Sequence, residues 1–273
     1  MPAKLGILAG GGVLPARAIA ACREEGRPFF VLGFEGETDP ETLEGAPHAV
    51  VRLGAAGTAL DLLRQQHVVE IVMAGRIKRP SFSALRPDWR GVQLLARVGA
   101  RAAGDDGLLG AVVGELEREG FRVVGIDQVL TSLLAPAGVF GRHSPTAVDE
   151  RDIATGMRVA QALGRLDVGQ GVVVQNGVVL AVEAAEGTDA MIDRAAGLRL
   201  ESHGGVLVKM KKPQQERRVD LPTIGTTTID RAAAAGLAGI AVEAGGALVV
   251  DRATVVAHAD AAGLFLVGVP AGS

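Results

Sequence analysis

The sequence predicts an α/β protein with two domains, an N-terminal Rossmann-like domain built on a parallel sheet and a C-terminal mixed α/β domain. The chain has 273 residues, more than the ~100–150 residues typical of one domain. Hydrophobic residues make up 48% and aromatic residues 3%, with 38 glycines, which is typical of cores built from Val, Ala and Leu. Short apolar runs alternate with amphipathic segments along the first half, and this alternation predicts parallel βαβ units.

The N-terminal half opens with a predicted strand, a glycine turn and a helix. Residues 5–9 form a short apolar run that meets Gly10-Gly11-Gly12, and Pro15 begins an amphipathic segment that extends to Glu25. Further strands are expected at 29–34, 48–53, 69–74 and 121–126, with helices at 58–66, 91–103 and 105–119. Ligands of such a sheet gather at the carboxyl ends of its strands.

A domain linker is predicted at residues 134–148, which contain two prolines and two glycines without periodicity. The domains are therefore expected at 1–133 and 149–273. In the second domain, helices are expected at 149–163, 188–196 and 226–235 and from 253, and strands at 205–210 and 264–269. Asn176-Gly177 predicts a hairpin over 171–184, and Gly245-Gly246 suggests the turn of a second hairpin.

Composition argues against several classes of protein. The formal net charge of −3 and the scarcity of aromatic side chains disfavour a nucleic-acid-binding protein. Cys22 is the only cysteine, lies in an apolar helical pattern, and is expected in the core rather than in a reactive site. We find no signal peptide and no apolar run of the ~20 residues that span a bilayer. A soluble cytoplasmic protein is expected, and peripheral membrane contact stays open.

A basic segment between residues 208 and 232 is the first candidate site. Between Lys209 and Arg218, five basic side chains stand against the single acid Glu216, a concentration of positive charge that suits a phosphate. Asp220 precedes Leu-Pro, and Thr223 and Thr226 lie where a helix would present free amides. This pattern predicts a pyrophosphate site with Asp220 as metal ligand or base. The alternative is a solvated basic face with Asp220 in a turn or cap. The basic residues are Lys209, Lys211, Lys212, Arg217 and Arg218.

The glycine turn at residues 10–12 is the second candidate. It fits the first two glycines of a dinucleotide fingerprint, and Glu35 lies where a ribose-binding acid is expected. Pro15 occupies the position of the third glycine, which counts against NAD. We favour a phosphate or nucleotide ligand at this turn over a purely structural role.

A third candidate is the acidic segment 183–189. Thr188 is a plausible helix cap, and Glu186 and Asp189 either favour the first helical turn through its dipole or join Asp220 in a site for a hard cation. Asp105 and Asp106 present the same choice, and there capping is favoured. The five histidines lack zinc-ligand spacing.

Six segments of the chain match one known family: residues 6–15, 74–80, 104–106, 164–171, 183–189 and 218–225. Together they resemble the UDP-2,3-diacylglucosamine pyrophosphatases of lipid A biosynthesis. The likeness covers nearly the whole chain, and its last three segments are specific to that family.

The resemblance implies a cytoplasmic, metal-dependent hydrolase whose two domains close around the lipid. Water would attack the α-phosphorus of UDP-2,3-diacylglucosamine, releasing UMP and 2,3-diacylglucosamine 1-phosphate (lipid X), with Mg²⁺ or Mn²⁺ as cofactor. Asp220 matches the family's aspartate and is the expected catalytic residue. Transient contact with the inner-membrane surface and a homodimer are further expectations. The expected metal ligands are Asp220, Glu186 and Asp189, and the expected substrate-binding residues are Gly11, Gly12, Leu14, Arg79, Thr188, Lys209, Lys211, Arg217, Arg218 and Thr223.

Two rival functions follow from the residues alone. The strand, glycine turn and helix together with Glu35 would suit an NAD(P)-linked oxidoreductase. A non-catalytic sensor of a nucleotide or lipid would use the same basic cluster without activating water.

Overall fold

A computed structural model describes residues 2–77, 87–99, 104–201, 204–212, 218 and 221–271. The chain forms two compact units, and the second begins at Ser132. Arg218 belongs to the first unit although the residues on either side of it in the described chain belong to the second. The expected α/β class is confirmed in both units.

The first unit is built on a fully parallel five-stranded sheet. Its strand order is β3-β2-β1-β4-β5, so β1 lies between β2 and β4. The strands are β1 (Leu5–Ala9), β2 (Phe29–Phe34), β3 (His48–Val51), β4 (Glu70–Ala74) and β5 (Arg122–Val123). The helices are α1 (Val13–Glu24), α2 (Pro40–Leu43), α3 (Ala56–Gln65), α5 (Trp89–Gly99), α6 (Gly104–Arg118) and α7 (Ile126–Val129).

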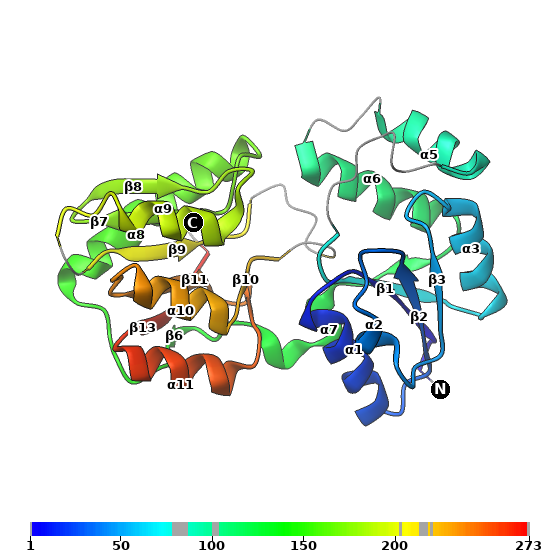
Figure 1. Cartoon of the computed structure of the whole chain (residues 1–273), viewed down its shortest axis with the longest axis horizontal. Helices are drawn as coiled ribbons and strands as arrows, with labels where there is room; N and C mark the ends of the chain where they lie inside the picture. The colour runs from blue at the N-terminus through cyan, green and yellow to red at the C-terminus, as the bar shows by residue number, and fades with distance from the viewer. Residues whose placement is uncertain are drawn as a thin grey trace. The chain divides into compact units, whose positions relative to one another are not determined.

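Helices cover the two faces of this sheet (Figure 1). Leu63 of α3 and Val113 of α6 pack with Leu32 and Ile71 from the strands. Cys22 of α1 is only 1% exposed, as expected for a core cysteine, and burial raises the pKa of its thiol. The continuous apolar strands follow from burial on both faces, which parallel sheets require.

The second unit is built on a mixed six-stranded sheet. Its order is β6-β13-β11-β9-β7-β8, with β9, β11 and β13 parallel to one another and β7 antiparallel to both β8 and β9. The strands are β6 (Gly138–Val139), β7 (Gly171–Gln175), β8 (Val178–Val182), β9 (Val206–Lys209), β11 (Gly239–Glu243) and β13 (Phe265–Val269). A separate parallel pair joins β10 (Thr223–Ile224) to β12 (Leu248–Val249). The helices are α8 (Ala147–Arg165), α9 (Gly187–Ala196), α10 (Thr226–Ala234) and α11 (Arg252–Ala262), and a 3-10 turn, η1 (Thr131–Leu133), lies where the unit begins.

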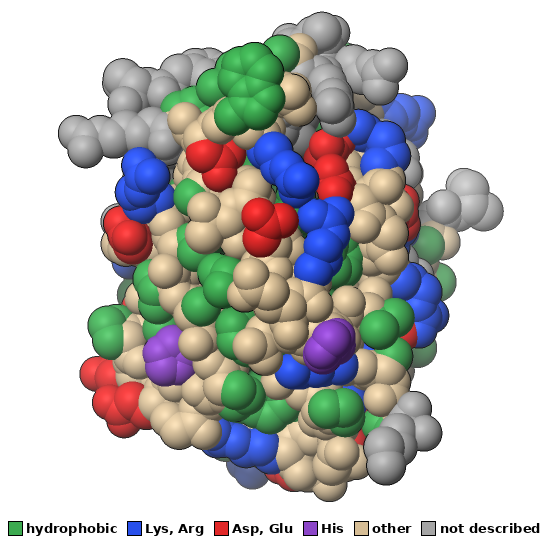
Figure 2. All heavy atoms as spheres, turned by 90° about the vertical axis from the view of Figure 1, so that its right-hand side faces the viewer, with side chains coloured by type: hydrophobic (Ala, Val, Ile, Leu, Met, Phe, Trp, Pro, Cys, Tyr) green, Lys and Arg blue, Asp and Glu red, His purple; other side chains and the backbone are tan. Residues whose placement is uncertain are grey.

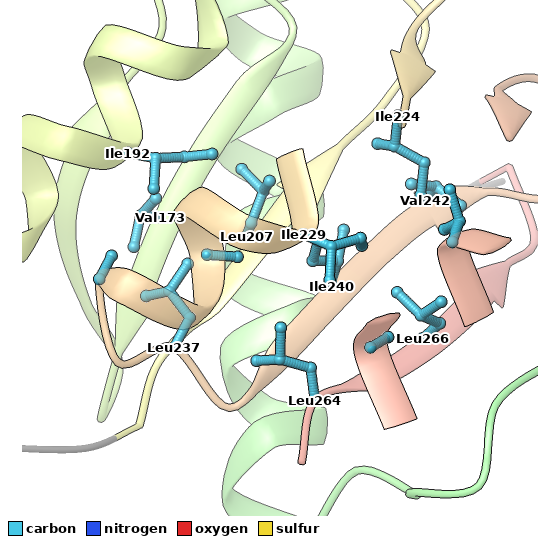
Figure 3. Close-up of a cluster of buried hydrophobic side chains, with 14 of the residues drawn as sticks. Val173, Ile192, Leu207, Ile224, Ile229, Leu237, Ile240, Val242, Leu264 and Leu266 are labelled. Carbon is cyan, nitrogen blue, oxygen red and sulfur yellow. The ribbon is translucent and has the colours of Figure 1, made fainter. Parts of the chain in front are cut away.

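The larger core of this unit joins one face of the sheet to α9, α10 and α11. Figure 3 shows Ile192 of α9 and Ile229 of α10 packed toward Leu207 and Ile240 of the central strands. On the other face, Ile153 of α8 packs in a separate cluster with the strands. Two helical layers thus hold β9 and β11 at the centre of the unit.

Local signals explain the best-predicted elements of the second unit. Asn176 and Gly177 have φ values of 52° and 80°, which a tight two-residue hairpin turn requires, and the predicted β7–β8 hairpin is confirmed. Asp152, 1% exposed, accepts hydrogen bonds from both turn amides at 2.9 and 2.6 Å. Thr146 and Asp149 form a capping box at the start of α8.

The second predicted hairpin is wrong. After Gly245-Gly246 the chain enters β12, which pairs in parallel with β10, whereas β11 pairs in parallel with β9 and β13. β11 is buried along its whole length and lies between β9 and β13 in the sheet. A local turn signal does not predict which strands pair with each other.

Residues of the predicted linker contribute to the second unit. β6, which lies in the predicted linker, pairs antiparallel with β13 of the second unit. The Ala135 amide donates to the Ala247 carbonyl at 2.9 Å, and Arg252 of α11 donates to the carbonyls of Ser132 and Leu134.

Candidate functional site

Three buried charged side chains meet one edge of the six-stranded sheet. Because β8, β9 and β11 run in the same direction, their carboxyl ends lie at a common edge, where ligands of α/β sheets bind. Glu183 follows β8, Lys209 ends β9, and Glu243 ends β11. They are 7%, 4% and 7% exposed. Charged groups are rarely buried unless they are paired or serve a function.

Lys209 is the centre of this cluster. Its ammonium donates to the Thr188 hydroxyl at 2.8 Å and to the Thr223 carbonyl at 3.3 Å. Thr188 stands in the first turn of α9, and Thr223 begins β10. Three of the residues predicted to bind substrate, from three separate elements, therefore come together.

Glu183 completes the arrangement. Its Oε1 accepts a hydrogen bond from the Thr188 hydroxyl at 2.8 Å. A β-carbon at Gly171 would lie 2.5 Å from Oε2, and one at Gly169 would collide with the Glu183 carbonyl. These glycines are needed because the carboxylate and its backbone pass so close to them.

The three sequence segments most specific to the pyrophosphatase family thus meet at one place. Gly169 and Gly171 come from residues 164–171, Glu183 and Thr188 from 183–189, and Thr223 from 218–225. Lys209, outside these segments, joins the last two. Glu183 was not among the predicted substrate-binding residues, although its position at the end of the predicted hairpin was visible in the sequence. Its close approach to Gly169 and Gly171 is seen only in the structure.

The neighbouring lysines have other partners. The Lys211 backbone amide donates to Glu243 Oε2 at 3.1 Å. The Lys212 ammonium pairs with Asp167 Oδ1 at 2.6 Å, with both side chains largely buried. The side chains of Lys209 and Lys212 are therefore built into the edge of the sheet and do not lie on a solvated face.

The two predicted metal ligands at the start of α9 face arginines. Glu186 pairs with Arg194 at 2.7 Å, and its pKa is lowered by its own backbone amide and by the Arg194 hydrogen bond. Asp189 lies 3.6 Å from Arg231. The described residues contain no group of three or more His, Cys, Asp or Glu side chains placed to hold a metal ion.

The glycine turn of the first unit is closed by the chain's own groups. The Gly10 and Gly11 amides donate to the carbonyls of Ala74 and Arg76, both at 2.8 Å, and the Gly12 amide donates to Asp39 Oδ2 at 2.7 Å. A carboxylate and two carbonyls thus already occupy the amides that would hold a dinucleotide pyrophosphate.

Within the described part of the first unit, the other predicted substrate-binding residues are Leu14 and Arg218. Leu14 is half-buried in α1, and Arg218 forms an ion pair with Glu117 of α6. Arg79, Arg217 and Asp220 lie outside the described residues, so their roles stay predictions.

The surface and the helices bear on the kind of partner. On the face shown in Figure 2, lysine and arginine side chains are interspersed with aspartate and glutamate, without the broad basic field of a nucleic-acid-binding protein. None of the described helices is both long and apolar enough to cross a membrane.

Fold and site together define a two-unit α/β protein with a buried lysine at the carboxyl edge of a sheet, an arrangement suited to an anionic ligand. The family model of the LpxI N-terminal domain matches residues 4–133, and that of the LpxI C-terminal domain matches residues 136–267. The UDP-2,3-diacylglucosamine pyrophosphatase LpxI of Caulobacter vibrioides is 48% identical over 273 aligned positions, and the alignment covers 97% of each chain. The chain belongs to the LpxI family.

Solved structures give weaker likenesses. A CobK precorrin-6A reductase is 10% identical with a TM-score of 0.34, covering 100% of this chain and 89% of that one. The biotin carboxylase domain of a thermophilic 2-oxoglutarate carboxylase is 16% identical with a TM-score of 0.23, covering 63% and 35%. Neither score supports an argument about function.

Proposed function

We propose that the protein is a hydrolase of lipid A biosynthesis that cleaves the pyrophosphate of UDP-2,3-diacylglucosamine into UMP and 2,3-diacylglucosamine 1-phosphate. The observation that carries the proposal is the 48% identity to the Caulobacter pyrophosphatase over nearly the whole chain. The meeting of the family-specific segments around Lys209 supports it, since that is where an anionic substrate would be recognised.

Lys209 supplies a fixed positive charge for the pyrophosphate. The diester carries two negative charges that repel an incoming nucleophile, and a preorganised cation reduces this repulsion in the transition state. Because Lys209 is only 4% exposed, its charge acts with little screening by water.

Asp220 is the proposed catalytic residue that activates water for attack on the α-phosphorus. The chain just beyond it is firmly anchored: Leu221 is buried, and Thr223 and Ile224 pair with Leu248 and Val249. The Thr223 carbonyl, three residues after Asp220, also accepts from Lys209. These contacts tie the backbone that follows Asp220 to the lysine that would bind the phosphate.

A divalent cation, Mg²⁺ or Mn²⁺, is proposed from the family resemblance. Within the described chain, Glu186 and Asp189 are engaged by Arg194 and Arg231, so these two carboxylates do not form a cation site as they stand. We therefore assign no step to the metal, and chelation tests the dependence.

The cellular setting follows from the substrate. We propose a cytoplasmic enzyme that meets its lipid at the inner-membrane surface transiently. Vesicle co-sedimentation with and without the lipid substrate tests this association, and light scattering tests the predicted homodimer.

Incubation of the full chain with UDP-2,3-diacylglucosamine and Mg²⁺, followed by chromatography of the nucleotide, tests the function. UMP and lipid 1-phosphate should form in equal amounts. Binding of the lipid nucleotide without UMP release would support a sensor, and substrate-dependent oxidation of NADH or NADPH would support an oxidoreductase. Either result would overturn the proposal.

A further inference from the structure

The buried carboxylate of Glu183 has no part in the reaction as derived so far. It is 7% exposed and lies at the carboxyl edge of the sheet, next to the lysine proposed to bind the pyrophosphate. Oε1 accepts from Thr188, whereas Oε2 is buried and has no hydrogen-bond partner among the described residues. A buried carboxylate used at one oxygen only is costly to keep, which points to a role beyond stability.

The direction of the hydrogen bonds shows what this carboxylate does. An ammonium has only donors, so the Thr188 oxygen must accept from Lys209. The single proton of the Thr188 hydroxyl is then free to be donated elsewhere, and it goes to Glu183. Glu183 therefore fixes the hydroxyl in the orientation that turns its lone pairs toward Lys209. The hydrogen bonds from Lys209 to Thr188 and from Thr188 to Glu183 have the same length, 2.8 Å.

The glycines beside Glu183 hold the carboxylate in place. Gly171 leaves room for Oε2, and Gly169 allows the Glu183 backbone to pass. The Glu183 amide donates to the Gly171 carbonyl at 2.8 Å, which fixes the residue to the start of β7. The carboxylate is thus held in a fixed position, which a residue that orients another side chain requires.

We propose that Glu183 is a positioning residue that acts on the reaction through Thr188 and Lys209. It orients the hydroxyl that holds the ammonium, and it places a negative charge two hydrogen bonds away from that ammonium inside the unit. The inference rests on the proposed function and on the role given there to Lys209.

The test compares Glu183→Gln, Thr188→Val and the double variant by UMP release, all in the full chain. Each single variant should lower kcat/KM about 10- to 100-fold, the range for a lost hydrogen bond within a charged chain. Because both residues act through the same contact, the double variant should fall within about threefold of the poorer single variant. Independent residues would give losses that multiply.

Asp152→Asn is the matched control, since it neutralises a buried carboxylate at the opposite end of β7 and β8. It should lower the Tm but leave kcat/KM of the folded protein within about twofold of wild type, whereas Glu183→Gln should lose activity at temperatures where it is folded. If Glu183→Gln fails to fold, an unchanged kcat/KM in Thr188→Val would still overturn the inference.

Three results would overturn the inference: activity of folded Glu183→Gln or Thr188→Val within threefold of wild type, multiplying losses in the double variant, or an equal loss in Asp152→Asn. With an active wild type, these results leave the proposed function standing. A wild type that releases no UMP would overturn the proposed function itself.

Discussion

Replacing Lys209 with Met removes the charge proposed to bind the pyrophosphate while keeping a stem of similar length. A unit charge about 4 Å from a phosphate oxygen interacts by about 4 kcal/mol at an effective dielectric constant near 20. An effective dielectric constant of about 20 serves for buried charges as well as for pairs near the surface, and Lys209 is 4% exposed. An energy of about 4 kcal/mol corresponds to about a thousandfold in kcat/KM. Because the flexible Met side chain can repack and recover part of this loss, kcat/KM should fall about 100- to 1,000-fold.

UMP release measured over a range of substrate concentrations, alongside a melting curve, checks this prediction. Lys212→Met is the control because Lys212 lies in the same basic run but already pairs with Asp167 at 2.6 Å, so it should cost less than about tenfold. Folded Lys209→Met with activity within threefold of wild type would refute the reasoning, as would an equal loss in Lys212→Met.

Three further predictions follow from the site. Asp220→Ala should abolish UMP release while the melting temperature stays near that of wild type, and normal turnover would remove Asp220 from the mechanism. EDTA should stop the reaction and added Mg²⁺ or Mn²⁺ should restore it, because carboxylates suit hard cations; full activity in chelator would show that the protein's own charges suffice. Since its own backbone amide and Arg194 lower the pKa of Glu186, the contribution of Glu186 to stability should be present above the unfolded pKa and lost as pH falls through the folded one. Glu186→Gln should therefore lower the Tm at about pH 7 and leave it unchanged at about pH 2, and an equal effect at both values would contradict this.

Elements with a strong local signal could be predicted from the sequence. The hairpin at Asn176-Gly177 follows from two residues that tolerate positive φ. The helix predicted at 149–163 is confirmed as α8, which begins two residues earlier, at Ala147, behind the capping box of Thr146 and Asp149. The glycine turn after β1 was also predicted, but the groups that its backbone amides bind were not. The carbonyl of Arg76 and the carboxylate of Asp39, distant in sequence, bind its amides.

The candidate site could be predicted only in part because it depends on strand order. Thr188, Lys209 and Thr223 were each predicted to bind substrate, but their contact arises from the placement of β9 beside β7 and β11. The contact of Glu183 with Thr188 is local, across the turn between β8 and α9, but the sequence does not show that Glu183 is buried next to Lys209. The turn at Gly245-Gly246 does not form a hairpin because β11 pairs with β9 and β13 on its two sides.

Hydrolysis in H₂¹⁸O tests the central claim most directly, since it reports both the cleavage and the phosphorus attacked. Mass spectrometry of the two products should find one ¹⁸O in UMP and none in 2,3-diacylglucosamine 1-phosphate, as attack of water on the α-phosphorus requires. Label in the lipid 1-phosphate would reverse the proposed orientation of the substrate, and the absence of both products would contradict the assignment as a pyrophosphatase.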